Sequence, residues 1–71
     1  MNERNNIAER IDELIRYSNK TKRKVAEEIG VSEVTVGQYT NAKAIPSLLT
    51  FKKLCIALDC DYQDILGELP K

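Results

Sequence analysis

The sequence contains no histidine and no tryptophan, and its two cysteines, Cys55 and Cys60, stand five positions apart. Without histidine, neither a Ser-His or Cys-His catalytic pair nor a Cys/His zinc site can be assembled, and the cysteine spacing is not that of a CxxC pair. The glycine-rich loops that bind phosphate, GxGxxG and GxxxxGK, are absent as well. We therefore expect a protein that is not an enzyme and that uses no metal and no cofactor.

Long hydrophobic runs are also missing. No stretch approaches the roughly 20 apolar residues that cross a bilayer, and the N-terminus MNERNNIAER has no apolar segment like that of a secretory signal. These absences predict a cytoplasmic protein with no membrane partner. A disulfide is disfavoured in that compartment, so we expect Cys55 to be a small core residue on the apolar face of a helix.

Neither sign of charge dominates. Eleven lysines and arginines balance eleven aspartates and glutamates, and the pI of about 6.2 is lower than that of many nucleic-acid-binding domains. The distribution is nevertheless polarised, because a basic run without acidic residues covers positions 16–24 and acidic residues gather after position 58. The run consists of Arg16, Lys20, Lys22, Arg23 and Lys24. We expect the acidic end to lie away from any bound polyanion.

The apolar residues that are present recur at helical spacing. They predict helices over about 6–17, 22–29, 33–40 and 48–58, followed by a last short helix that carries Tyr62, Ile65 and Leu66 and is ended by Gly67. The spacing of Leu48, Phe51, Leu54, Cys55 and Leu58 makes the fourth helix the most hydrophobic and the most central one. With 71 residues, the chain is expected to form one domain, 1–71, with flexible ends at 1–5 and 68–71.

Capping residues support these boundaries. Thr21, Ser32 and Ser47 precede the second, third and fourth helices, and Gly30 supplies the left-handed residue that ends the second. Asn6 with Glu9 and Asp61 with Asp64 have the spacing of capping boxes for the first and last helices. Five short helices with short connections and no alternating pattern predict an all-α, five-helix orthogonal bundle.

The second and third helices are joined by IGVS, a short turn containing glycine, which is the spacing of a helix-turn-helix. The string TKRKVAEEIGVSEVTVGQYTNAK resembles the helix-turn-helix of Cro and phage repressors (the XRE family), and PSLLTFKKLCIALDCDYQDIL is similar to that family's fourth and fifth helices. The resemblance covers about 7–66, and its specific marks are Ala26, Gly30, Val36, Tyr39 and Pro46. It implies a lambda-repressor-like domain with its helix-turn-helix over about 22–40. It also implies that the third helix enters the major groove and that paired domains bind a twofold-symmetric site.

The chain departs from the family pattern at four positions. Lys22 stands where many members have a glutamine that bridges phosphate and recognition helix, and Gly37 stands in mid-helix where a side chain is usual. Thr40 and Ala42 replace a frequent Glu and Gly around the following loop. These differences predict a pattern of DNA contacts that differs in detail from that of the family.

The outward face of the third helix follows from its inward face. If Val36 and Tyr39 face the core, then Val34, Gly37 and Gln38 point outward at about 100° per residue, with Glu33 at the edge. Gln38 could pair with adenine and Val34 could contact a thymine methyl, although both could also be ordinary exposed residues. Glu33 could accept from cytosine or only stabilise the helix through its dipole. Gly37 marks either close approach to DNA or a tolerated loss of helix stability.

A phosphate site is predicted at the start of the second helix. Lys22, Arg23 and Lys24 place three cations where the helix dipole favours anions. A phosphate bound by the free amides, by the Thr21 hydroxyl and by these cations would reverse that cost; the alternative is a solvated charge run. A second phosphate contact is predicted at Asn41 and Lys43, against the alternative of ordinary loop polarity.

The sequence thus predicts a sequence-specific DNA-binding transcriptional regulator, a repressor that binds double-stranded operator DNA as a homodimer. The alternative is a protein-interaction module or antitoxin-like partner on the same scaffold. Its contact surface would be Tyr62, Ile65, Leu66 and Leu69, a cluster that could equally pair two copies on DNA or close the core.

Overall fold

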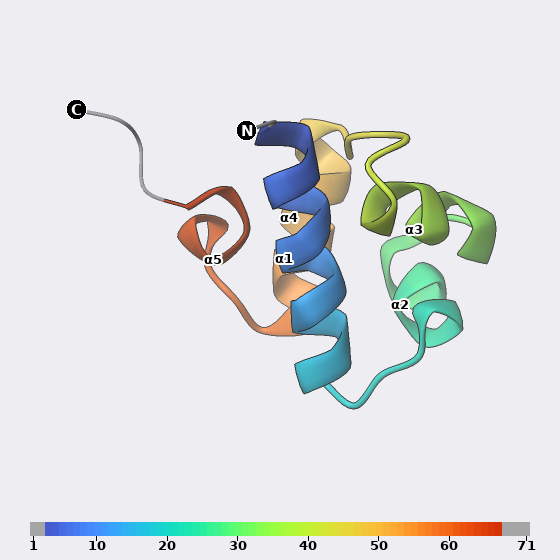
Figure 1. Cartoon of the computed structure of the whole chain (residues 1–71). Helices are drawn as coiled ribbons and strands as arrows, with labels where there is room; N and C mark the ends of the chain where they lie inside the picture. The colour runs from blue at the N-terminus through green and yellow to red at the C-terminus, as the bar shows by residue number, and fades with distance from the viewer. Residues whose placement is uncertain (1–2, 68–71) are drawn as a thin grey trace.

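The computed structural model describes residues 3–67, and this part of the chain contains five helices and no strand (Figure 1). The helices are α1 (Glu3–Tyr17), α2 (Lys22–Ile29), α3 (Glu33–Thr40), α4 (Leu48–Leu58) and α5 (Tyr62–Leu66). α2 packs against α3 and α4, and α1 packs against α3 and α5. In Figure 1, α2 and α3 lie on one side of α1 and α5 lies on the other. The predicted all-α, five-helix architecture is confirmed.

Side-chain caps start three of the helices where the sequence predicted them. The hydroxyls of Thr21, Ser32 and Ser47 each accept a hydrogen bond from the backbone amide three residues later, at 3.0, 3.1 and 3.2 Å. Such a bond satisfies one of the amides that a helix N-terminus leaves without an intrahelical partner. At the start of α5, the backbone amide of Asp61 donates to the Asp64 carboxylate at 2.9 Å, as in the predicted capping box.

The predicted start of the first helix was wrong. α1 begins at Glu3, so Asn6 lies inside the helix and does not form a capping box with Glu9. No glycine or proline precedes Asn6, and the helix therefore continues toward the N-terminus. Residues 3–5 are accordingly helical where a flexible end was expected. The remaining positions of the expected flexible ends, 1–2 and 68–71, lie outside the described residues.

The core receives side chains from every helix. Cys55 belongs to it, with 7% of its surface exposed, as predicted. Leu48 does not, because 82% of its surface is exposed. Side chains of a helix lean toward its N-terminus, and Leu48 is the first residue of α4, so no preceding turn lies beneath it. The buried residues are Ala8, Ile11, Ile15, Val25, Ala26, Ile29, Val36, Tyr39, Leu54, Cys55, Leu58 and Ile65.

α5 is held to α1 through the side chain and through the backbone carbonyl of one α5 residue, Ile65. Ile65 is fully buried, and the Arg10 guanidinium donates to its carbonyl oxygen at 3.4 Å. Gly67 has φ 77°, and a β-carbon at this position would lie 2.6 Å from Arg10 Nη1. The positive φ favours glycine where α5 ends, whereas the Arg10 guanidinium is the end of a flexible side chain and could move aside.

Candidate nucleic-acid interface

The turn between α2 and α3 sets the angle between these two helices. Gly30 ends α2 in the left-handed conformation, at φ 77°, and the amides of Gly30 and Val31 both donate to the Ala26 carbonyl, at 2.9 and 3.0 Å. Ala26 is itself 3% exposed, which leaves little room for a larger side chain where the helices meet. Val36 is fully buried against this turn unit. The backbone hydrogen bonds and the shared core together hold α3 at a fixed angle on α2.

The predicted outward face of α3 is open to solvent. Val34 is 72% exposed, although it is apolar, and Glu33 and Gln38 extend the same surface. Gly37 lies between them, and a β-carbon there would have no atom within 4 Å. The structure thus brings the four predicted base-reading residues, Glu33, Val34, Gly37 and Gln38, together on one uncovered face, while Val36 and Tyr39 face the core.

Gly37 is not required by the fold of the free protein. Its φ is not positive, and open space surrounds the position of its missing β-carbon. Its carbonyl oxygen accepts from the Thr40 hydroxyl at 3.0 Å and from the Asn41 amide at 3.1 Å, contacts that any residue could provide. Glycine here costs the helix about 1 kcal/mol relative to alanine. Neither packing nor backbone geometry in the described part of the chain compensates for that cost.

The N-terminus of α2 presents donors that the described residues leave unused. The Thr21 oxygen accepts from the Lys24 amide, which leaves its hydroxyl proton available, and the amides of Lys22 and Arg23 have no acceptor in the described chain. Lys24 is exposed and Lys22 is half-buried, and neither forms an ion pair with any residue from 3 to 67. Arg23 reaches Glu27 at 3.8 Å, with 80% of its side chain exposed. The four side chains and two amides together form a cationic helix start, which we call the α2 phosphate site because a phosphate contact is predicted there.

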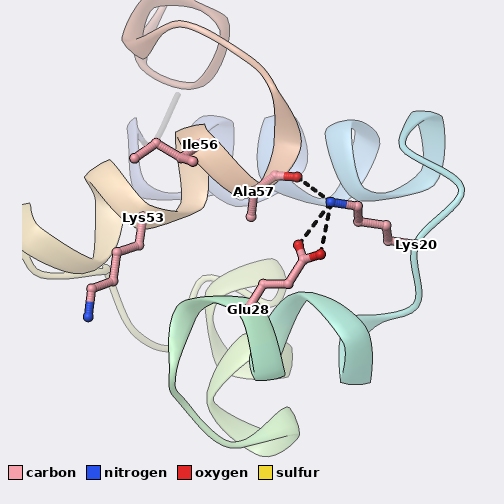
Figure 2. A pocket seen from close by; sticks show the side chains of 5 residues that line it. All are labelled: Lys20, Glu28, Lys53, Ile56 and Ala57. Carbon is pink, nitrogen blue, oxygen red and sulfur yellow. Dashed lines mark hydrogen bonds and ion pairs between the residues drawn. The ribbon is translucent and has the colours of Figure 1, made fainter.

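The fold divides the basic run of the sequence. Lys20 does not contribute to the α2 phosphate site, because its ammonium group donates to both oxygens of Glu28, at 3.1 and 2.9 Å, and to the Ala57 carbonyl at 2.6 Å (Figure 2). These three groups, with Lys53 and Ile56, line a groove of about 370 Å³. Lys53 points away from the ion pair in Figure 2. Arg16 is similarly engaged by Asp12, at 2.7 Å.

The second predicted phosphate contact lies in the loop after α3. The amides of Lys43 and Ala44 donate to the Gln38 carbonyl at 2.9 and 3.3 Å, so the loop folds back onto the end of α3. Ala42 adopts φ 61° to make this turn. Asn41 and Lys43 are both exposed, and Asn41 also borders a shallow groove against Asn5 and Glu9 of α1. These hydrogen bonds therefore hold the two predicted contact residues at the C-terminal end of α3.

The sequence reasoning missed a set of exposed apolar residues. Ile56 is 71% exposed and Leu49 is 63% exposed. The spacing of Leu49 and Ile56 could have revealed them, since residues seven positions apart share a face of a helix. That face lies outside the buried stripe of α4. Tyr62 and Leu66, which belong to the predicted contact surface, are also exposed on α5, at 51% and 46%. Ile45 and Leu48 are two more exposed apolar residues, near the start of α4.

Neither a metal site nor a membrane-spanning helix is found within residues 3–67. No group of three or more cysteine, aspartate or glutamate side chains in this range is arranged to hold a metal ion. No helix in the range has the length and apolar character needed to cross a membrane.

α2 is capped and has free N-terminal amides, Gly30 forms the turn, and α3 presents an exposed face. These features define the class of helix-turn-helix DNA-binding domains. The chain belongs to the helix-turn-helix family of the XRE type, whose model matches residues 18–65, and the predicted resemblance is thereby confirmed. This is a family of DNA-binding transcription regulators.

A solved structure has the same fold. The chain is similar to the crystal structure of the restriction-modification controller protein C.AhdI from Aeromonas hydrophila, with a TM-score of 0.82 and 22% sequence identity. The match covers 87% of this chain and 94% of that one. At this identity, the comparison establishes the shared helix-turn-helix fold alone. No curated protein matches the sequence.

Proposed function

We propose that this protein is a cytoplasmic, sequence-specific repressor of transcription that binds operator DNA with α3 in the major groove. The observation that carries the proposal is the uncovered face of α3, where Val34 is 72% exposed and Gly37 is surrounded by open space. An apolar side chain and a helix-weakening glycine on a face that packs against nothing are better explained by a bound partner than by solvent. The family of the chain and the controller activity named for C.AhdI both support a regulator that is not an enzyme.

The base-reading residues have distinct roles in this proposal. Gln38 presents an amide that donates to and accepts from the edge of adenine, and Val34 contacts the methyl group of a thymine. Gly37 allows the helix backbone to approach the groove without a side chain in between. Glu33 stabilises the first turn of α3 through the helix dipole and lies close enough to the same face to accept from a cytosine amino group.

The phosphate contacts flank this face. At the α2 phosphate site, the amides of Lys22 and Arg23 and the Thr21 hydroxyl would bind one phosphate, with Lys24 adding charge. Asn41 and Lys43, which follow the C-terminal end of α3, would bind another phosphate. The neutral net charge does not oppose this arrangement, because affinity depends on the phosphates that local cations neutralise. Asp61 and Asp64 belong to the start of α5, and α5 lies on the side of α1 opposite α2 and α3 (Figure 1).

We propose that the protein binds DNA as a homodimer paired through the apolar surface of α4 and α5. Ile56, Tyr62 and Leu66 supply exposed apolar area on these helices. Of the other residues in the predicted contact cluster, Ile65 is buried in the core and Leu69 lies outside the described residues. A twofold dimer of this kind should place half-site centres about 34 Å apart, and a series of operators with altered spacing tests the distance.

Phosphate binding is tested through its dependence on salt. Duplex affinity should fall steeply with salt, and Lys24→Ala should lower the slope of log affinity against log salt by about 0.9 for each phosphate that the lysine neutralises. Lys52→Ala is the matched control, because Lys52 is an exposed lysine on α4. A salt-independent affinity, or equal effects of the two substitutions, would reject the phosphate site.

Base reading is tested by selection from random duplexes. On the selected operator, Gln38→Ala should reduce affinity by about 1 to 3 kcal/mol and relax the preference at one base pair. Gln63→Ala, an exposed glutamine on α5, should change neither. If Gln38→Ala weakened binding equally on every sequence, the residue would not read a base.

The exposed apolar area on α5 also favours a second candidate, a protein-interaction module or antitoxin-like partner. In that case Lys22, Arg23 and Lys24 could all become alanine without loss of partner binding, whereas Tyr62→Asp would abolish it. The DNA-binding proposal expects the triple alanine variant to lose duplex binding, so this variant separates the two functions.

A further inference from the structure

The two cysteines meet at the turn that follows α4. The Cys60 amide donates to the Cys55 carbonyl at 3.0 Å, the Asp59 amide donates to the Ile56 carbonyl at 3.2 Å, and Asp59 has φ 51°. These are the features of a Schellman motif, in which the residues at the positions of Cys55 and Cys60 usually make an apolar contact. Here both positions carry thiols, and each thiol influences the pKa of the other.

The backbone of this turn keeps the two residues within the span of a disulfide. A carbonyl oxygen 3.0 Å from the partner amide nitrogen limits the two Cα atoms to a separation of at most about 7 Å, given standard bond lengths. Disulfides join Cα atoms that are about 4.4 to 6.8 Å apart. Because the backbone already holds the two residues within this span, joining the thiols requires rotation of side chains rather than movement of helices.

The pair is also reachable by a small molecule. Cys55 and Cys60 line a groove of about 410 Å³ together with Lys52, Asp59 and Tyr62. Cys55 reaches it from the core, whereas Cys60 is only half-buried. Cys60 is therefore the thiol that an oxidant meets first.

We propose that Cys55 and Cys60 form a reversible intramolecular disulfide when the protein meets a low-molecular-weight disulfide. The Cys60 thiol loses its proton and attacks one sulfur of the oxidant, which forms a mixed disulfide and releases one small thiol. The Cys55 thiol then loses its proton and attacks Cys60 Sγ, which releases the second small thiol. Two protein thiols are oxidised, one small disulfide is reduced to two thiols, and both protons pass to the departing sulfurs.

The surroundings of the pair make its thiols slow to react. Burial, followed by the neighbouring Cys55 thiol, raises the pKa of Cys60 to about 12, and the carboxylates of Asp64 and Asp61 add to the shift. Lys52 and Asp59 are the other charged groups that line the groove. Since the thiolate is the attacking form, the exchange should be slow at neutral pH and faster as pH rises.

Oxidation would fasten the end of α4 to the residue that leads into α5. A disulfide that closes so short a loop should raise Tm by about 5 to 10 °C in a domain of this size. The bond would join the last turn of α4 to the residue before the N-cap of α5, outside the base-reading face of α3 and the α2 phosphate site. Its formation is therefore measurable whether or not the protein binds DNA.

The test uses the full chain incubated with glutathione disulfide near pH 8.5, followed by alkylation in denaturant and intact-mass measurement. The expected product has lost two hydrogen atoms, carries no alkyl group, remains monomeric on a non-reducing gel and regains both thiols with dithiothreitol. Its Tm should exceed that of the reduced protein. Cys55→Ala should stop at a stable glutathione adduct on Cys60, and Cys60→Ser should show no rise in Tm with oxidant.

Three outcomes would overturn the proposal. These are a wild-type protein that keeps both thiols alkylatable after prolonged exposure, one that stops at the mixed disulfide, and one that forms covalent dimers instead of the internal bond. Because Cys60 is half-buried and Cys60→Ser is a small change, this variant tests the role of the pair even if Cys55→Ala folds poorly.

Discussion

Replacing Lys20 by methionine should destabilise the protein more than any other loss of a single positive charge on its surface. The substitution removes the ammonium group and keeps the aliphatic stem. It therefore breaks the bonds to both Glu28 oxygens and to the Ala57 carbonyl (Figure 2). Ala57 lies in the last turn of α4, where carbonyls lack an intrahelical partner and a cation is favoured by the helix dipole. One side chain thus joins the α1–α2 connection to α2 and to α4.

The contacts set the size of the effect. Hydrogen bonds to charged groups contribute about 1.5 to 3 kcal/mol, but the side chains of Lys20 and Glu28 are 32% and 29% exposed, so water screens the pair. We expect Lys20→Met to lower the free energy of unfolding by about 1 to 2 kcal/mol, and Tm by about 5 to 10 °C. Arg16→Met is the control. Its partner is Asp12 on the same helix and its side chain is 75% exposed, so about 0.3 to 0.5 kcal/mol is expected.

Denaturant and thermal unfolding measure both effects, and a double-mutant cycle with Glu28→Gln isolates the pair. The coupling between Lys20 and Glu28 should be about 1 kcal/mol. Lys20→Met should also leave the salt dependence of DNA binding unchanged, because its ammonium group is engaged within the protein. If Lys20→Met were no more damaging than Arg16→Met, or if the coupling were zero, this account of the α2–α4 contact would be refuted.

Three further predictions concern single positions. Gly37→Ala should raise stability by about 1 kcal/mol and weaken operator binding at least tenfold; an affinity that is unchanged or improved would remove glycine from the DNA contact. Ala42→Gly should stabilise the protein by about 0.5 to 1 kcal/mol, since Ala42 has φ 61°, and a loss of stability by chemical denaturation would contradict this. The pKa of Cys60 is raised to about 12 from 9.0, so the folded state retains a proton that the unfolded state loses between these values. Stability should therefore fall above pH 9 more steeply in the wild type than in Cys60→Ser, and equal slopes would refute the shift.

Much of the local structure could be predicted because it depends on neighbouring residues. Thr21, Ser32 and Ser47 cap their helices through an amide three positions away, and Gly30 adopts its left-handed conformation within one turn. The same logic failed at Asn6, because a capping residue that is not preceded by a helix breaker does not force a helix to begin. Local patterns thus located the helices more reliably than the first residue of α1.

The candidate site was predictable only in part. The outward face of α3 followed from the inward positions of Val36 and Tyr39, because both faces belong to one helix. The basic run was different. Lys20 and Lys24 stand in the same charged stretch, yet Lys20 is engaged by Glu28 and by Ala57, which lies 37 positions away in the chain. Likewise, Leu48 fits the apolar spacing of α4 but lies where no other helix covers it.

The amino-acid order alone therefore determined where helices form, how most of them are capped and which face of α3 points outward. Each of these depends on residues within about one helical turn of one another, where backbone geometry fixes their relation. Only the tertiary structure decided which lysines remain available for phosphate, which leucines are covered and that both cysteines line one accessible groove. Those outcomes depend on how helices from distant parts of the chain pack together, and periodicity within a single helix carries no information about that packing.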